Sequence, residues 1–555
     1  MLSGAQILME ELTNHGVDTV FGYPGGQAIN IYDALYQNSH RIRHVLACHE
    51  QGAAHAADGY ARATGKVGVV IATSGPGATN LVTGIATAYM DSVPLVAITG
   101  NVPTHLLGRD SFQEIDIAGV TIPITKHNFI VKDVTKLAET VRRAFEIANS
   151  GRKGPVLIDI PKDVQVAMCD YAPGFSPPPI EPQAPDPEQI QTAAQLIRDS
   201  KRPFIFAGGG VVSAGAADLL LRFSQMIDAP VTTSLMGMSA VPWDYPLFTG
   251  GVGMHGAYAS TKGINECDLV IAIGTRFSDR VIGDKEKFAA NAKILHIDID
   301  EAEIGKNIFA HHFLIGDIAK SLAALLGQLE QKQNPDWHGH ISRLKTVQSF
   351  DGVPDRLCPP TIIRKLCQRL QPDTVVATDV GQHQMWTAQY YRFSTPRTFL
   401  TSGGLGTMGF GLGAAIGAAV GTAGGRNGQR TLLVTGDGSF HMNLQELATA
   451  VTYRLDIIIL LINNNVLGMV RQWQDIFFEK RFSSTTLDRK TDYVALAKAF
   501  GAQGVSIENY QDIDKALDFA MAQTGPVVID CKTDPDEYVY PMIPPGKCVE
   551  SIILK

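Results

Sequence analysis

Two apolar runs in the last third of the chain each end in a short polar motif, and this pairing strongly constrains the fold. Residues 431–435 and 456–462 have the length and composition of buried strands; the first runs into a Gly-Asp-Gly motif centred on Asp437, and the second ends in an Asn-Asn pair that closes at Asn464. Residues 443–446 match a capping box, which predicts a helix start between them. A right-handed crossover would place Asp437 and Asn464 side by side at the carboxyl ends of two parallel strands.

These side chains predict a metal-bridged diphosphate. The carboxylate of Asp437, the amide oxygen of Asn464 and nearby backbone carbonyls are hard oxygen ligands that suit Mg²⁺. Gly438 has no side chain to keep a phosphate away from the backbone, and a following helix N-terminus favours an anion. Either motif alone is more often an ordinary turn, so the prediction rests on their combination.

Glu50 is the candidate acid of the first third of the chain. It lies between an apolar strand at residues 44–48 and a helix of small residues at 53–63. Two further Gly-rich strand-to-helix turns, residues 22–26 and 73–80, indicate backbone that a ligand approaches closely. The structural alternative is a glutamate in the first turn of a helix, where the helix dipole stabilises a negative charge.

The composition is that of a large cytoplasmic enzyme. A length of 555 residues allows about three domains, and we find neither an apolar run of membrane-spanning length nor a targeting leader. The net charge of −8, without a basic tract, argues against nucleic acid as a partner. The cysteines are scattered, odd in number and free of CxxC spacing, which predicts a reducing compartment rather than disulfides or zinc; they are Cys48, Cys169, Cys267, Cys358, Cys367, Cys531 and Cys548.

Two changes in composition divide the chain. Residues 172–187 are too rich in proline for a helix or a central strand and predict a stiff linker. A polar stretch from about 331 to 360 predicts a second linker. The fold class is therefore predicted to be α/β, with three doubly wound parallel-sheet domains at residues 1–171, 188–330 and 360–555.

With these motifs the chain resembles, from end to end, the thiamine-diphosphate enzymes of the pyruvate oxidase and decarboxylase group. It is most similar to the catalytic subunits of the acetohydroxyacid synthase (acetolactate synthase) family. The resemblance implies a pyrimidine-binding domain, a central FAD-binding domain and a diphosphate-binding domain, in that order. It also implies active sites between two subunits of a homodimer or homotetramer, with Glu50 of one chain facing Asp437 and Asn464 of the other.

The resemblance assigns further site residues. The metal ligands are Asp437, Asn464 and the carbonyl of Val466. The catalytic residues are Glu50, Gln113, Gly25 and Lys162. Thiamine diphosphate is contacted by Gly381, Gln382, His383, Gly406, Met408, Gly436, Gly438, Ser439 and Met469. FAD, which has a structural role in this family, is contacted by Arg152, His255, Gly256, Gly274, Arg276, Asp298 and Asp317.

Four further motif residues are expected to bind the second substrate. By similarity, Phe112, Met254, Arg280 and Trp473 shape the pocket for a second 2-keto acid. Arg280 offers a bidentate clamp for a carboxylate, and Trp473 a flat apolar wall that can favour an ethyl over a methyl group. Without the motif, a surface ion pair of Arg280 with Asp279 or Asp284 would be an equally good interpretation.

Two residues depart from the family pattern. Gly413 stands where relatives usually carry proline, which is expected to loosen a helix start. Ser278 replaces an aspartate, which bears on the affinity for flavin.

The resemblance implies a specific reaction. Pyruvate is decarboxylated on thiamine diphosphate with Mg²⁺ bound, and the hydroxyethyl carbanion condenses with a second 2-keto acid to give 2-acetolactate or 2-aceto-2-hydroxybutyrate, the first common step of branched-chain amino-acid biosynthesis. A separate small regulatory subunit is an expected partner, whereas nucleic acid and membrane are not. The alternatives are a pyruvate oxidase of the same group and a non-catalytic binding subunit.

Overall fold

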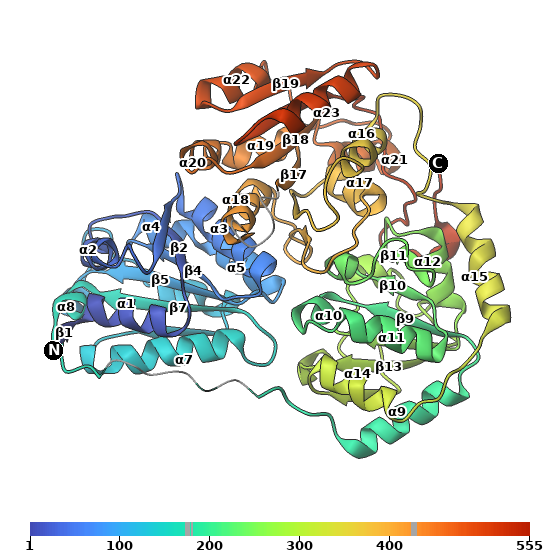
Figure 1. The fold of residues 1–555 in the computed structure, drawn as a ribbon, viewed down its shortest axis with the longest axis horizontal. Coiled ribbons are helices and arrows are strands. Elements are labelled where there is room, and N and C mark those ends of the chain that lie inside the picture. Colours follow the sequence, from blue (N-terminus) through green and yellow to red (C-terminus); the bar gives the residue numbers. More distant parts are fainter. Residues whose placement is uncertain (173–177, 179–180, 423–429) are drawn as a thin grey trace.

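The chain forms three parallel sheets, each of six strands, in a computed structural model that describes residues 1–172, 178, 181–422 and 430–555. Figure 1 shows three lobes: the N-terminal sheet and its helices, the central sheet, and the C-terminal sheet, which adjoins both. Helices pack on both faces of the sheets, so the predicted α/β class with three doubly wound parallel sheets is confirmed.

The N-terminal sheet has the strand order β3-β2-β4-β5-β7-β6. Its strands are β2 (Thr19–Gly22), β3 (Arg43–Leu46), β4 (Gly68–Ala72), β5 (Leu95–Asn101), β6 (His127–Ile130) and β7 (Pro155–Pro161). Its helices are α1 (Gly4–Asn14), α2 (Ile29–Gln37), α3 (Glu50–Thr64), α4 (Pro76–Asn80), α5 (Val82–Met90), α6 (Ile117–Thr121), α7 (Leu137–Asn149) and α8 (Lys162–Val166); β1 (Leu2–Ser3) and β8 (Met168–Cys169) pair separately and antiparallel.

The central sheet has the order β11-β10-β9-β12-β13-β14. Its strands are β9 (Pro203–Ala207), β10 (Val231–Thr233), β11 (Phe248–Gly251), β12 (Leu269–Ile273), β13 (Lys293–Asp298) and β14 (His312–Ile315). Its helices are α9 (Pro187–Asp199), α10 (Gly209–Ser213), α11 (Ala217–Ile227), α12 (Tyr258–Glu266), α13 (Asp279–Ile282), α14 (Ile318–Leu326) and α15 (Pro335–Val347).

The C-terminal sheet has the order β16-β15-β17-β18-β20-β19. Its strands are β15 (Val376–Thr378), β16 (Phe399–Leu400), β17 (Thr431–Gly436), β18 (Ile457–Asn463), β19 (Gln503–Ile507) and β20 (Val527–Lys532). Its helices are α16 (Pro359–Cys367), α17 (Gln382–Tyr390), α18 (Phe410–Thr422), α19 (Asp437–Asn443), α20 (Glu446–Thr452), α21 (Gly468–Phe477), α22 (Tyr493–Phe500) and α23 (Asp512–Ala522).

Alternate residues of the central strands enter different cores, as expected for sheets covered on both faces. In β18, Ile458 and Leu460 join one apolar cluster, whereas Ile457 and Ile459 join another that also contains α3 of the N-terminal lobe. Helices α3 and α18 lie side by side at the centre of that shared cluster (Figure 1). The hydrophobic core therefore continues from lobe to lobe.

Two sequence predictions are wrong. The stretch 331–360 is not only a linker, because Pro335 opens helix α15 and Trp337 and Ile341 of that helix are buried against the central sheet. The expected capping box at residues 443–446 does not form either, since Asn443 ends α19 and the side chain of Glu446 bonds to the N-terminal lobe instead. In both places tertiary contacts decide the local structure.

The structure describes only part of the first predicted linker. Residues 173–177 and 179–180 of the predicted 172–187 linker lie outside the described residues, and α9 begins at Pro187.

Candidate functional site

The predicted metal ligands lie at one edge of the C-terminal sheet. Strands β15, β17 and β18 are neighbours there, and their carboxyl ends lead into the turns before α17, α19 and α21. After β15 the chain continues to its neighbour β16 on one side, and after β17 it continues to β18 on the other side. The position between β15 and β17 is therefore a topological switch point, the usual ligand position in open α/β sheets. Gly436 pairs with Ile462 in register, so Asp437 and Asn464 follow directly from adjacent strand ends.

The donor atoms at this edge suit a hard cation. Asp437 is the first residue of α19, and burial raises its pKa to about 6. Asn464 is also buried, and its Oδ1 accepts a hydrogen bond from the N–H of Val466 at 3.2 Å. Within the described residues there is no cluster of three or more His, Cys, Asp or Glu side chains for a metal. A cation here would therefore use one carboxylate with amide and carbonyl oxygens, as Mg²⁺ does.

The glycines of this edge leave space that side chains would fill. A Cβ on Gly436 would lie 3.0 Å from Nδ1 of His383, and a Cβ on Gly438 would lie 2.9 Å from Leu467 and 3.8 Å from Cε of Met408. Gly406, two residues before Met408, has a left-handed φ of +71°. The turns after β15 and β17 and the loop before α18 thus converge on one cradle.

A second set of polar groups faces the same cradle. Gln382 donates hydrogen bonds from Nε2 to Gln472 and to the carbonyl of Glu537, and Ser439 donates to the carbonyl of Val380. Burial lowers the pKa of His383 to about 3, so the ring is neutral. Its Nε2 is buried without a hydrogen-bond partner among the described residues. Such an orphaned nitrogen fits a bound polar ligand.

The candidate acid lies at the corresponding edge of the N-terminal sheet. Glu50 begins α3, is buried, and accepts a hydrogen bond from Nδ2 of Asn80 at 2.9 Å. A Cβ on Gly77 would lie 3.1 Å from Oε1 of Glu50, and a Cβ on Gly25 would lie 2.4 Å from Thr73. The turn after β4 therefore approaches this carboxyl group closely, and the turn after β2 packs against the turn after β4.

Two other predicted catalytic residues reach the same turns. Gln113 has a φ of +59°, and its Cα would lie 3.0 Å from a Cβ on Gly75, in the turn before α4. Nζ of Lys162 donates to the carbonyl of Gly26 at 3.3 Å. The structure therefore gathers Glu50, Gly25, Gln113 and Lys162 at this edge of the N-terminal sheet.

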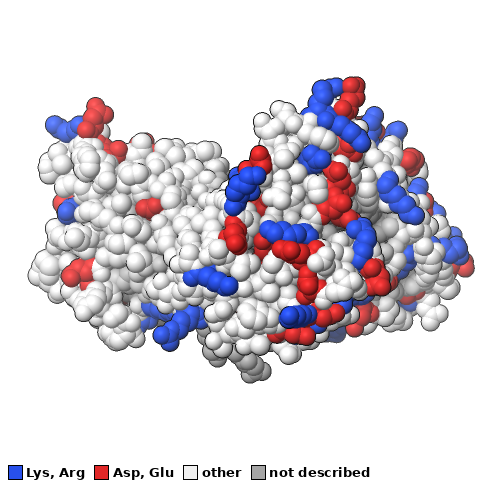
Figure 2. Space-filling view, turned by 90° about the horizontal axis from the view of Figure 1, so that it is seen from above, with Lys and Arg blue, Asp and Glu red and all other residues white. Residues whose placement is uncertain are grey.

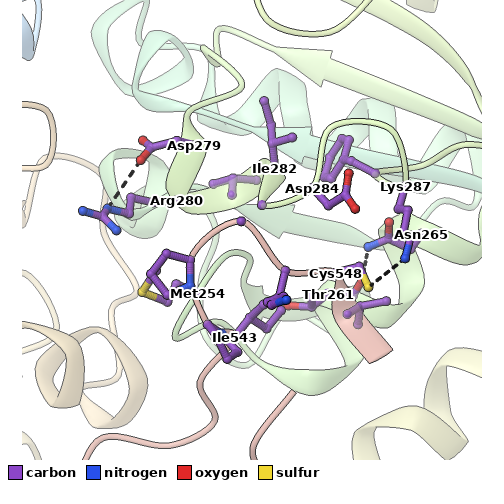
Figure 3. Close-up of a pocket in the computed structure, with 18 residues that line it drawn as sticks. Met254, Thr261, Asn265, Asp279, Arg280, Ile282, Asp284, Lys287, Ile543 and Cys548 are labelled. Atoms are coloured by element: carbon purple, nitrogen blue, oxygen red, sulfur yellow. Dashed lines mark hydrogen bonds and ion pairs between the residues drawn. The ribbon is translucent and has the colours of Figure 1, made fainter. Parts of the chain in front are cut away.

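The predicted pocket for a second substrate is only partly assembled. Met254 and Arg280 line one pocket (Figure 3), and the guanidinium of Arg280 lies 5.8 Å from the ring centroid of Trp473. Arg280 is exposed and lies 3.8 Å from the carboxylate of Asp279, so the ion pair considered as the alternative is also present. Phe112 is 84% exposed and is not among the residues that line the pocket within the described chain.

The second wall of this pocket comes from the C-terminal residues 543–549, which sequence reasoning did not identify. The N–H of Ile543 donates to the carbonyl of Met254, whose own N–H donates to the carbonyl of Arg280. Residues near the chain end carry no motif, so the sequence offers no signal for this placement.

The predicted flavin residues border the central sheet at its β9/β12 switch point. Gly274 follows β12 with a φ of +56°, and a Cβ there would lie 2.7 Å from the Cα of Gly210. Burial raises the pKa of Asp298, at the end of β13, to about 6. Asp317 accepts a hydrogen bond from the N–H of Lys320 and caps α14. Ser278 precedes α13 without a side-chain cap.

His255 and two arginines complete this set. Burial lowers the pKa of His255 to about 4; its Nδ1 lies 3.2 Å from the carbonyl of Pro541, and its Nε2 is buried without a partner among the described residues. The adjacent Gly256 packs where a Cβ would lie 2.6 Å from a backbone carbonyl. Arg152 pairs with Glu303 at 2.8 Å, and Arg276 donates to the carbonyl of Met90 at 2.6 Å. Both arginines thus bridge the central and N-terminal lobes.

Sequence reasoning also missed the clamp at the start of α3. The buried carboxylate of Glu446 accepts hydrogen bonds from the backbone N–H groups of Cys48 and His49, next to Glu50. Burial raises the pKa of Glu446. The hydrogen bond from Oγ1 of Thr449 and those from the N–H groups of Cys48 and His49 oppose that rise. Met469, in α21, packs partly buried against the adjoining apolar cluster.

Comparison with known proteins agrees with this architecture. Family models match in three parts: the N-terminal TPP binding domain of thiamine pyrophosphate enzymes at residues 2–120, their central domain at 190–325 and their C-terminal TPP binding domain at 379–531. Over the part of the chain that the structure describes, we find no helix with both the length and the apolar character to cross a membrane.

Full-length relatives narrow the assignment. The chain is 46% identical to the acetolactate synthase isozyme 2 large subunit of Escherichia coli, with 98% of each chain covered. It is 45% identical to the acetolactate synthase large subunit of Parasynechococcus marenigrum, over 98% of this chain and 90% of the relative. It is 43% identical to the acetolactate synthase of Arthrospira platensis, over 98% and 96%. The chain therefore belongs to the thiamine pyrophosphate enzymes and, within them, to the acetolactate synthase large-subunit family.

Proposed function

We propose that this protein is the catalytic subunit of an acetolactate synthase. It decarboxylates pyruvate with the help of thiamine diphosphate and transfers the two-carbon unit to a second 2-keto acid, giving 2-acetolactate or 2-aceto-2-hydroxybutyrate. The observation that carries the proposal is the end-to-end similarity, at 42–46% identity, to acetolactate synthases. The arrangement of candidate residues at two topological switch points supports it.

Thiamine diphosphate, when bound, supplies a cationic ring that accepts the electron pair released with CO₂. The C-terminal cradle would hold its diphosphate. Asp437, Asn464 and the carbonyl of Val466 offer the oxygen atoms for a bridging Mg²⁺, while Gly438 lets phosphate oxygens approach the backbone. The neutral ring of His383 keeps a buried nitrogen free for a hydrogen bond to this ligand.

Glu50 would act as the acid at the other end of the cofactor. Asn80 donates a hydrogen bond to one carboxylate oxygen, and the side chain of Glu50 is buried. A carboxyl group held in this way can exchange a proton with a ring nitrogen without moving. The same packing helps to exclude water from the reaction.

The second acid would be recognised by Arg280 and Trp473. The guanidinium can bind a carboxylate with two parallel hydrogen bonds, and the indole can contact the alkyl group. Met254 borders the same space. Phe112, Gln113, Gly25 and Lys162 would complete the pocket from the N-terminal lobe.

We propose that two subunits form each active site. Glu50 packs among residues of its own lobe. Phe112 is 84% exposed and Met442 is 53% exposed, so both present apolar surface. Figure 2 shows a face on which one half is largely uncharged, while Lys, Arg, Asp and Glu intermix on the other. An uncharged area of this kind suits an interface between copies of the chain.

FAD and a regulatory subunit belong to the same proposal. Groups for a flavin nucleotide at the central switch point come from Arg152 and Arg276. Asp298 and the buried Nε2 of His255, which has no partner among the described residues, add further polar atoms. Several relatives are called large subunits, which supports a separate small partner for this chain. The cysteines are all unpaired, which supports a reducing compartment such as the cytoplasm.

Product analysis tests the function directly. The purified chain is incubated with pyruvate, Mg²⁺, thiamine diphosphate and FAD without oxygen or another electron acceptor, and the products are identified. We expect acetolactate, with the flavin remaining oxidised. Acetate formed in step with flavin reduction would assign an oxidase, acetaldehyde a decarboxylase, and the absence of turnover with tight pyruvate binding a non-catalytic subunit.

A further inference from the structure

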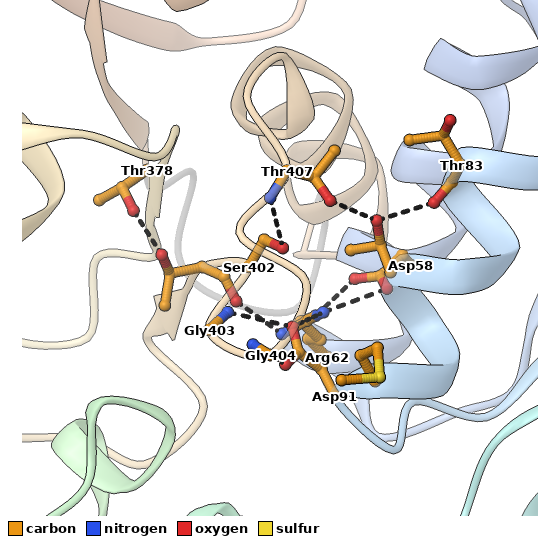
Figure 4. A network of polar contacts seen from close by, with 12 residues as sticks. Asp58, Arg62, Thr83, Asp91, Thr378, Ser402, Gly403, Gly404 and Thr407 are labelled. Carbon is orange, nitrogen blue, oxygen red and sulfur yellow. Dashed lines mark hydrogen bonds and ion pairs between the residues drawn. The ribbon is translucent and has the colours of Figure 1, made fainter. Parts of the chain in front are cut away.

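The turn between α5 and β5, Met90 to Ser92, is contacted from three directions by residues that sequence reasoning did not connect. Its middle residue, Asp91, has a fully buried carboxylate. That carboxylate accepts hydrogen bonds from Nη2 of Arg62 at 2.9 Å, from the N–H of Gly403 at 3.3 Å and from the N–H of Gly404 at 2.7 Å (Figure 4). The turn thus holds the loop that leads into α18.

Arg62 holds the same loop from the other side. It is buried in α3, pairs with Asp58 one turn earlier and donates from Nη1 to the carbonyl of Thr401 at 2.9 Å. Its guanidinium also lies 5.1 Å from the ring centroid of Phe410, the first residue of α18. A buried cation shared by two carboxylates and a carbonyl leaves little freedom to any of these groups.

The loop held in this way carries predicted cofactor residues. Gly406 and Met408 lie on it, and Cε of Met408 would lie 3.8 Å from a Cβ on Gly438. The Oγ1 atoms of Thr87, in α5, and Thr407 are 2.7 Å apart, which adds a further link from α5 to this loop. A displacement of the turn would therefore move the groups that line the diphosphate cradle.

The opposite side of the turn faces the candidate flavin site. Arg276 donates from Nη2 to the carbonyl of Met90, and Arg152 donates from Nε to Oγ of Ser92 at 2.9 Å. Ser92 has a φ of +59°, so the turn is locally strained and depends on these contacts. The family resemblance assigns both arginines to the flavin.

We propose that the turn from Met90 to Ser92 couples the flavin site to the thiamine-diphosphate cradle, with Asp91 as the positioning residue. The inference rests on the proposed function, because it needs both cofactors to bind. A flavin that orders Arg152 and Arg276 would order the turn, and the turn would fix the loop from Thr401 to Met408. Because coupling is reciprocal, each cofactor then tightens the binding of the other.

The coupling is measured by titrating the full-length protein with thiamine diphosphate and Mg²⁺, with and without saturating FAD, and following intrinsic tryptophan fluorescence. For the wild-type protein we expect FAD to tighten thiamine diphosphate binding about fivefold or more. The reverse titration, with flavin fluorescence as the signal, should give the same factor. Neither readout requires turnover.

A pair of glycine variants isolates the contact without removing a charge. In Gly404→Ala the new Cβ would lie 2.9 Å from both Oδ1 of Asp91 and the carbonyl of Met90, so the loop must move away from the turn. In the control, Gly403→Ala, the closest atom is Sδ of Met236, the flexible part of a side chain that can move. We expect the coupling factor to fall towards one in Gly404→Ala and to persist in Gly403→Ala.

A second pair tests the carboxylate itself. Asp91→Asn removes the charge that Arg62 and the two amides share, and should also abolish the coupling. Asp268→Asn is its control, because Asp268 likewise accepts two backbone N–H groups, but from Lys201 and Arg202 in the central lobe.

Equal thiamine diphosphate affinities with and without FAD in the wild-type protein would overturn the inference alone. Full coupling in both Gly404→Ala and Asp91→Asn would overturn it as well. A wild-type protein that binds no thiamine diphosphate in the presence of Mg²⁺ would overturn the proposed function and the inference with it.

Discussion

Three buried carboxyl groups of this protein differ in the hydrogen-bond donors that surround them. Glu50 accepts a hydrogen bond from the side-chain amide of Asn80, and Asp298 accepts one from the N–H of Asp300. Glu446 accepts hydrogen bonds from two backbone N–H groups of another lobe. All three are buried, and burial raises the pKa of Glu446 and of Asp298. This difference makes the roles separable by conservative substitution.

Replacing Glu50 by Gln should lower turnover of pyruvate about 100-fold while thiamine diphosphate still binds. The amide keeps the shape of the carboxyl group and can still bond to Asn80, but it cannot exchange the proton. Steady-state rates and cofactor titrations measure the two effects. Glu10→Gln, which affects only the partly exposed pair of Glu10 with Arg41, is the control and should leave both unchanged. Normal turnover in Glu50→Gln would exclude the acid role.

Replacing Asp298 by Asn should stabilise the flavin-free protein, and more strongly at high pH. Burial raises the pKa of this group from 3.8 to about 6. The folded state therefore disfavours ionisation, and the resulting loss of stability develops as pH rises through that interval. The gain from Asp298→Asn should be larger at pH 8 than at pH 5 by about 1 kcal/mol.

Thermal unfolding of the flavin-free protein at both pH values checks this prediction. Asp186→Asn, at the exposed N-cap of α9, is the control and should show no such pH dependence. A gain of the same size at pH 5 and pH 8 would contradict the assigned pKa direction.

At the scale of elements, the contact between α3 and α18 depends on glycine. A Cβ on Gly417 would lie 1.8 Å from the carbonyl of Ala56, and a Cβ on Gly413 would lie 2.7 Å from Cβ of His55. The sequence suggested that Gly413 loosens a helix start. It lies in the first turn of α18, where the absence of a side chain also allows the two helices to approach closely. Figure 1 shows this pair between the lobes that carry Glu50 and Asp437.

Gly417→Ala should therefore destabilise the protein by about 1–3 kcal/mol or more, since neither backbone can move without disturbing the shared core. Gly339→Ala provides the matched control, because Gly339 also lies within a helix, but a Cβ there would meet only the end of Arg343 at 3.7 Å. That change should stabilise by about 1 kcal/mol through helix propensity alone. Chemical unfolding of both variants measures the contrast, and equal effects would show that the close contact is not limiting.

At the scale of the whole molecule, the three lobes repeat one design. Each has a six-stranded parallel sheet with a switch point, and the candidate ligands gather at those edges. Apolar clusters that cross lobe boundaries hold the edges in fixed relation. If Glu50 and the candidate metal ligands act in one active site, their two sheet edges come either from one chain or from two.

Complementation between two inactive variants distinguishes these two cases. If Glu50 of one chain serves the metal site of another, a dimer of Glu50→Gln with Asp437→Ala has one intact site and one doubly altered site. Co-expressing the two variants in equal amounts should therefore restore about a quarter of the wild-type activity. Each variant expressed alone is the control and should remain inactive. A mixture without recovered activity would place both residues in the same chain's site.

The local chemistry of this protein can be predicted from its amino-acid sequence. Apolar runs that end in Gly-Asp-Gly or Asn-Asn are readable because strand length, turn residues and metal-ligand types are all local properties. The same holds for Glu50 at the start of its helix and for the α/β class, since periodicity along the chain predicts both. The family motifs added the identity of the cofactor.

Contacts between residues that are distant in the chain follow from the three-dimensional fold and not from local patterns. The clamp of Glu446 on α3, the Asp58–Arg62–Asp91 group and the pocket wall at residues 543–549 join segments far apart in the chain. The four-residue spacing of Asp58 and Arg62 in a helix of small residues was a visible hint, but its partner Asp91 and the loop it holds were not. A buried charge must be paired, so such groups restrict how the segments that carry them can move. The spacing of residues in the sequence does not identify the partner.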